Sequence, residues 1–154
     1  MARHEPRPEL GDARRRGMHN IGDAAALTGV SAKMIRHYEQ IGLIPPASRT
    51  FANYRLYSEA DLHRLRFIKR ARSLGFSIRQ IEALLGLWGD PQRASADVKA
   101  LARAHAEALE QKIAEMQAMQ RALVELAAHC HGDRRPECPI LDDLARPAPA
   151  AADR

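Results

Sequence analysis

The feature that most constrains the fold is a long helical stretch from Ser95 to about Ala128. Nine positions along it, spaced alternately four and three residues apart, carry seven apolar side chains. These positions are Val98, Ala102, His105, Leu109, Lys112, Met116, Met119, Leu123 and Leu126. The spacing is typical of a coiled-coil seam, and at ~1.5 Å per residue the helix spans roughly 50 Å. The rest of the chain is too small to cover it, so we expect a homodimer.

Residues 18–92 predict a helical head in front of this long helix. A short apolar helical face over 21–27 ends at Gly29, and Ser31 is a good N-cap for a second helix that runs to about Gln40. Two short helices joined around a glycine form a helix-turn-helix pattern. Ser58 and Ser77 are expected to begin a third and a fourth helix.

Basic side chains lie where such a head would meet a polyanion. Residues 18–72 carry nine Lys or Arg and four acidic residues, whereas residues 73–154 carry ten and twelve. Lys33 and Arg36 fall near the start of the second helix, where side chains can reach phosphates and base edges in a major groove. The charge therefore favours a nucleic-acid-binding head on a near-neutral body.

A small hairpin wing is expected after the second helix. The stretch "NYRLY" alternates as a short strand, and two prolines precede it. Arg49, Tyr54, Arg55 and Tyr57 could contact sugar and phosphate from this wing, although one of the two tyrosines is expected instead to fix the wing to the helices.

The only two cysteines, Cys130 and Cys138, follow the long helix and enclose Gly132 and Pro136. The segment "PILDDL" after them predicts a short helix that begins with proline. Soft monovalent ions such as Cu⁺ prefer thiolates, and two sulfurs can complete a linear site. A Zn²⁺ or Hg²⁺ site assisted by His129 or His131, a redox pair, and thiols without a role stay open on this evidence.

Composition excludes several other classes. No apolar run is long enough for a membrane span, and the first residues contain no signal-peptide core, so we expect a cytoplasmic protein. No nucleophile–base pair, paired carboxylates or phosphate loop is present, which argues against an enzyme. A cytosolic copper-buffering protein is an alternative that would leave the basic helix-turn-helix unexplained.

Four stretches carry a resemblance to a known family: "MHNIGDAAALTGVSAKMIRHYEQIGLI", "RTFANYRLYSEADLHRLRFIKRARSLGFSIRQI", "DPQRASADV" and "CHGDRRPECPIL". Over about 18–144 the chain resembles the MerR family of transcriptional regulators, most closely its copper-sensing CueR/HmrR branch. The first 17 residues are not part of the family pattern, and Met18 begins the match.

The resemblance implies a mainly α fold, with a winged helix-turn-helix head, a long antiparallel coiled-coil dimerisation helix and a C-terminal metal-binding loop. The implied divisions are a disordered extension 1–17, the head 18–92, the dimerisation helix 93–128, the metal loop and short helix 129–145, and a disordered tail 146–154.

The resemblance also implies roles for single residues. DNA contacts would come from Lys33, Arg36 and Tyr38 on the recognition helix and from Tyr54 and Arg55 on the wing. The metal ligands would be Cys130 and Cys138, and Ser95 falls where divalent-sensing relatives carry a third cysteine. These residues imply an effector Cu(I), Ag(I) or Au(I).

As a partner, the resemblance implies a palindromic promoter with an over-long spacer. The metal-bound homodimer would distort this DNA so that RNA polymerase can use it.

Overall fold

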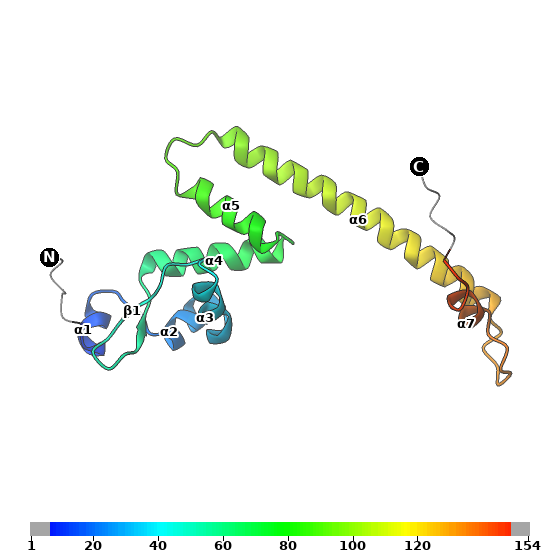
Figure 1. Cartoon of the computed structure of the whole chain (residues 1–154), viewed down its shortest axis with the longest axis horizontal. Coiled ribbons are helices and arrows are strands. Elements are labelled where there is room, and N and C mark those ends of the chain that lie inside the picture. The colour runs from blue at the N-terminus through cyan, green and yellow to red at the C-terminus, as the bar shows by residue number, and fades with distance from the viewer. Residues whose placement is uncertain (1–6, 149–154) are drawn as a thin grey trace. The chain divides into compact units, whose positions relative to one another are not determined.

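The computed structural model describes residues 7–148 and divides the chain into two compact units, Met1–Val98 and Lys99–Arg154. Figure 1 shows the elements, and each unit is described by itself. In chain order they are α1 (Leu10–Arg15), α2 (Ile21–Thr28), α3 (Ala32–Gln40), β1 (Ser48–Arg49), β2 (Arg55–Leu56), α4 (Glu59–Ser73), α5 (Ile78–Trp88), α6 (Ser95–His129) and α7 (Pro139–Leu144). The expected mainly α fold with a small wing is confirmed.

The predicted helix-turn-helix consists of α2 and α3. Asn20 caps α2 by accepting a hydrogen bond from the Asp23 N–H at 2.8 Å, and Ser31 caps α3 in the same way. The turn between them passes through Gly29 at φ 71°, a conformation that a residue with a Cβ adopts at a cost. A side chain there would also collide with the Lys69 ammonium. The glycine therefore fixes the turn through its positive φ, whereas the Lys69 ammonium is the end of a flexible side chain that can move aside.

The core of the head joins the helix-turn-helix to α4 and α5. Both later helices begin with a capping box, Ser58 with Asp61 and Ser77 with Gln80, as the sequence predicts for the serines. The fully buried large apolar side chains come from α3, α4, α5 and the segment 44–57 that contains the wing. They are Ile35, Ile44, Leu56, Tyr57, Leu62, Leu65, Ile68 and Ile81. At ~1.5–3 kcal/mol for each large apolar side chain, this burial supplies most of the stability of the head.

The wing is a two-stranded antiparallel hairpin in which Ser48 pairs with Leu56 and Arg49 with Arg55. An isolated bridge between His19 and Tyr57 continues it towards the start of α2. The predicted hairpin is confirmed, although its second strand covers only two residues of "NYRLY". At the tip, Asn53 takes φ 68°, which asparagine tolerates better than most residues.

The expectation of disorder over 1–17 is wrong for the part that forms α1. Leu10 and Ala13 are the apolar side chains of this helix, and Ala13 is completely buried. The helix ends at Arg15, and Gly17, φ 74°, lies just beyond its C-cap, where the Met18 N–H donates to the Ala13 carbonyl at 2.9 Å. This glycine-based stop satisfies carbonyls that would otherwise be left open. Residues 1–6 lie outside the described residues.

The second unit contains most of α6 and the whole of α7. The predicted long helix is confirmed, with an end one residue beyond the expected one, and α7 coincides with "PILDDL". The apolar side chains in the second half of α6 are largely exposed, with Met116 at 64% and Leu123 at 58%. No helix among the described residues is long and apolar enough to cross a membrane. Of the predicted tail 146–154, residues 149–154 lie outside the described residues.

Candidate DNA-binding surface and metal loop

The outer face of α3 carries the basic side chains that the sequence predicts there. Lys33 and Arg36 are exposed, whereas Ile35, between them, is completely buried. Tyr38 differs from the two basic residues because it is only 5% exposed and belongs to the core. The structure thus brings Lys33 and Arg36 together on one outer face and leaves Tyr38 largely inside.

Glu39 joins α3 to the wing, a role that the sequence did not predict. Its carboxylate accepts hydrogen bonds from the Arg55 Nε–H and the Tyr57 hydroxyl, both at 3.2 Å, and from the Ala47 N–H at 3.2 Å. The Glu39 side chain is 14% exposed, so these bonds are shielded from most of the solvent. Because one carboxylate holds three points of the wing, α3 and the wing form one unit.

The Glu39 cluster also explains the electrostatics of Tyr57. Burial, followed by the negative charge and hydrogen bond of Glu39, raises the pKa of Tyr57 to about 12, while Arg55 opposes the shift. The neutral hydroxyl is therefore the form that the folded head favours. Tyr57, completely buried, is the tyrosine that fixes the wing, as expected for one of the pair.

The wing tip presents aromatic side chains to solvent. Tyr54 is 63% and Phe51 82% exposed, while the Thr50 hydroxyl accepts from the Tyr54 N–H at 3.0 Å and is buried beneath them. The Arg49 guanidinium donates to the Asn53 carbonyl at 3.0 Å. One part-buried and one exposed hydrogen bond thus hold the base of an exposed tip, an arrangement suited to contact with another molecule.

The cysteine loop connects α6 to α7. Cys130 and Cys138 are free thiols, each partly exposed, and Cys138 immediately precedes the first turn of α7. Gly132 takes φ 63° in the loop. The Arg135 side chain bonds the Asp133 carboxylate and holds the pKa of Asp133 below its usual range. The middle of the loop, between the two cysteines, is therefore held by these Arg135–Asp133 bonds.

The donors near the two sulfurs bear on the ligand count. The Nδ1 atom of His129 lies 2.8 Å from the Glu125 carbonyl, so one ring nitrogen already has a partner. Within residues 7–148, no three His, Cys, Asp or Glu side chains are gathered to hold a metal ion. The chemistry of two thiols suits a soft ion that accepts two ligands. Ser95 lies exposed at the first turn of α6.

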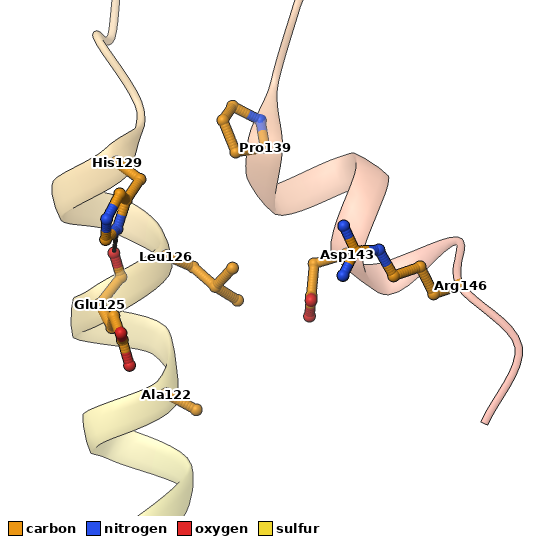
Figure 2. Close-up of a pocket in the computed structure, with 7 residues that line it drawn as sticks. All are labelled: Ala122, Glu125, Leu126, His129, Pro139, Asp143 and Arg146. Carbon is orange, nitrogen blue, oxygen red and sulfur yellow. Dashed lines mark hydrogen bonds between the residues drawn. The ribbon is translucent and has the colours of Figure 1, made fainter. Parts of the chain in front are cut away.

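A groove of about 670 Å³ separates the end of α6 from α7. Figure 2 shows Leu126 and His129 on the α6 side, with Pro139 and Asp143 opposite. Leu141 and Leu144 of α7 are 64% and 69% exposed. Within one chain, α7 therefore leaves these two leucine side chains largely uncovered.

Comparisons with known proteins agree with this architecture. The model of the MerR HTH family regulatory proteins matches residues 19–87, and the MerR DNA-binding model matches residues 62–126. The transcriptional regulator HmrR of Sinorhizobium medicae (strain WSM419) is 59% identical over 132 residues, 86% of this chain and 90% of that protein. CueR of Escherichia coli O6:H1 is 40% identical over 126 residues, 82% of this chain and 93% of that one.

A solved structure is also similar. The regulator PbrR691 of Ralstonia metallidurans CH34, crystallised with lead(II), is 35% identical, has a TM-score of 0.72, and matches 82% of this chain and 99% of its own. The chain therefore belongs to the MerR family of helix-turn-helix transcriptional regulators. The expectation that it is a DNA-binding regulator and not an enzyme is confirmed.

Proposed function

We propose that this regulator senses heavy-metal ions and activates metal-resistance genes when Cu(I), Ag(I) or Au(I) binds Cys130 and Cys138. The observation that carries the proposal is the donor set, because the chain has two cysteines and both lie in one loop. Soft monovalent ions are satisfied by two thiolates, whereas Zn²⁺ usually takes four ligands. Ser95, which supplies no thiol at the start of α6, fits the same choice. Relatives named as heavy-metal-dependent regulators support the coarser part.

The DNA partner is a palindromic promoter, bound by a homodimer through two heads. In each head, Lys33 and Arg36 enter the major groove, and Tyr54 and Arg55 contact the backbone from the wing. Tyr38 contributes at most the 5% of its surface that is exposed. The charge of the head and its wing support this arrangement.

The mechanism is a bias between two conformers of the DNA-bound dimer. Bending a site of this size costs on the order of 1–6 kcal/mol. A metal that favours the distorting conformer by ~1–3 kcal/mol shifts its population about 5–150-fold. Cys130 and Cys138 would hold the ion and so close the cysteine loop, which would let α7 repack against the partner's long helix and shift the two heads. The distorted spacer then suits RNA polymerase.

The test is transcription from a promoter with an over-long spacer, with each ion supplied to the reduced protein. The unaltered chain should activate with Cu(I), Ag(I) or Au(I). Cys130→Ser and Cys138→Ser should still occupy the promoter in a footprint but lose the response. His131→Ala, which alters the same loop without removing a sulfur, serves as the matched control and should keep it. A full response from either serine variant would contradict the proposal.

A second candidate is a divalent-ion sensor of the same fold. The similarity to a regulator crystallised with lead(II), and the histidines beside Cys130, favour this reading. Activation by Pb²⁺, Zn²⁺ or Hg²⁺, but not by Cu(I), would select it. A response to oxidant without metal would instead select a redox sensor, and metal binding without promoter binding would select a copper-buffering protein.

A further inference from the structure

The segment 7–17 is docked on the wing. The Phe51 N–H donates to the Pro8 carbonyl at 3.1 Å. Leu10 lines a cavity of about 240 Å³ together with Phe51 and Tyr54 of the wing tip. Ala13 is completely buried. The segment precedes residue 19, where the family match begins, so this docked piece is an addition to the common head.

The arginines of this segment divide into two groups. The Arg14 Nη2 lies 3.3 Å from the Asp23 Oδ2 on α2, and Arg15 pairs with Asp12 within α1. Arg7 and Arg16 are exposed and form no ion pair within the described residues. Arg14 and Arg15 are therefore neutralised by ion pairs, whereas the positive charges of Arg7 and Arg16 are unpaired within the described residues.

We propose that residues 7–17 extend the DNA-binding surface beyond the wing, with Arg7 and Arg16 contacting backbone phosphates. The inference rests on the proposed promoter binding by the wing. Arg7 directly precedes Pro8, whose carbonyl accepts a hydrogen bond from the Phe51 N–H, so the backbone of Arg7 lies beside the wing tip that carries Tyr54. Because the backbone of the segment is already ordered, phosphate contact costs less conformational entropy than it would from a loose tail.

The direct test measures promoter affinity against salt concentration. The double variant Arg7→Ala/Arg16→Ala keeps Pro8, Leu10 and Ala13 and therefore the docking. Each phosphate contact contributes about 0.9 to the slope of log K against log salt, so about four lost contacts in a dimer lower it by about 3 to 4. The matched control is Arg103→Ala/Arg121→Ala, which removes the same charge from exposed positions of α6 away from the seam, and its slope should not change.

A chain that begins at Met18 gives the second measurement. Its hydroxyl-radical footprint should lose protection at the outer flank of each half-site and keep the metal response. An unchanged slope in the double variant, or an equal fall in the control, would overturn the inference while leaving metal-dependent activation in place. Failure of the unaltered chain to bind any promoter specifically would contradict the proposed function, and this inference with it.

Discussion

The head and the C-terminal unit differ in how much apolar surface they cover by themselves. In the head, large side chains such as Leu62, Leu65 and Ile68 are completely buried within one chain. On α6, His105 is the only buried residue among those described, and Met116, Met119 and Leu123 are more than half exposed. The difference indicates that one chain covers the apolar core of its head by itself, whereas the C-terminal unit presents an apolar face of the kind that pairs with a second copy.

A charge in the seam should have the largest effect. We predict that Leu123→Glu weakens dimer formation by a factor of about 100 or more, because it removes apolar burial of ~1.5–3 kcal/mol and introduces a carboxylate that is costly to desolvate. Sedimentation equilibrium measures the change. The adjacent Val124→Glu, off the seam and 62% exposed, is the matched control and should leave the dimer nearly intact. Equal effects of the two variants would break the comparison.

Glu39→Gln should have an intermediate effect, confined to the head. The substitution keeps the size of the side chain but removes the charge that binds Arg55 and Tyr57. Since net contributions of hydrogen bonds to charged groups are ~1.5–3 kcal/mol, we expect a loss of about 1–3 kcal/mol in the free energy of unfolding, measured with urea. Promoter affinity should fall with it, and dimer formation should not change.

The control for Glu39 is Glu59→Gln. Glu59 lies 2.7 Å from the His19 ring near the same hairpin, but its side chain is 62% exposed. Such a pair contributes ~0–1 kcal/mol. If both glutamine variants destabilise the head equally, Glu39 has no special role in holding the wing.

The last expected effect on the head is confined to alkaline pH. The pKa of Tyr57 is about 12 in the folded head and near its ordinary value of 10.0 when unfolded. Its contribution to stability is therefore fully present below pH 10 and is lost as the pH rises towards 12. Denaturation of Tyr57→Phe across this interval should show a flatter dependence on pH, and equal slopes would contradict the assignment.

The helices could be predicted from the sequence because their signals, the caps and the apolar spacing, lie within a few neighbouring residues. Ser31, Ser58 and Ser77 are caps that need only their own turn, and the seam over 98–126 depends on spacing alone. Glu39 and its hydrogen-bond partners lie up to eighteen positions apart in the sequence, so they come into contact only when the hairpin has folded. No local pattern could have indicated it.

The N-terminal segment shows a different reason for failure. Its charge and prolines suggested disorder, but Leu10–Arg15 forms a short helix that Gly17 follows, and this glycine is a helix-stop signal present in the sequence. What the sequence could not supply is the hydrogen bond between Pro8 and Phe51, which depends on where the wing lies. The pairing of Cys130 with Cys138 around one ion is likewise a prediction from donor chemistry.

The most direct measurement of the central claim is X-ray absorption at the copper edge on the reduced dimer loaded with Cu(I). The account predicts two sulfur ligands in a linear arrangement, and loss of that signal in Cys130→Ser and in Cys138→Ser. A copper site with three or four ligands including imidazole nitrogen would contradict it.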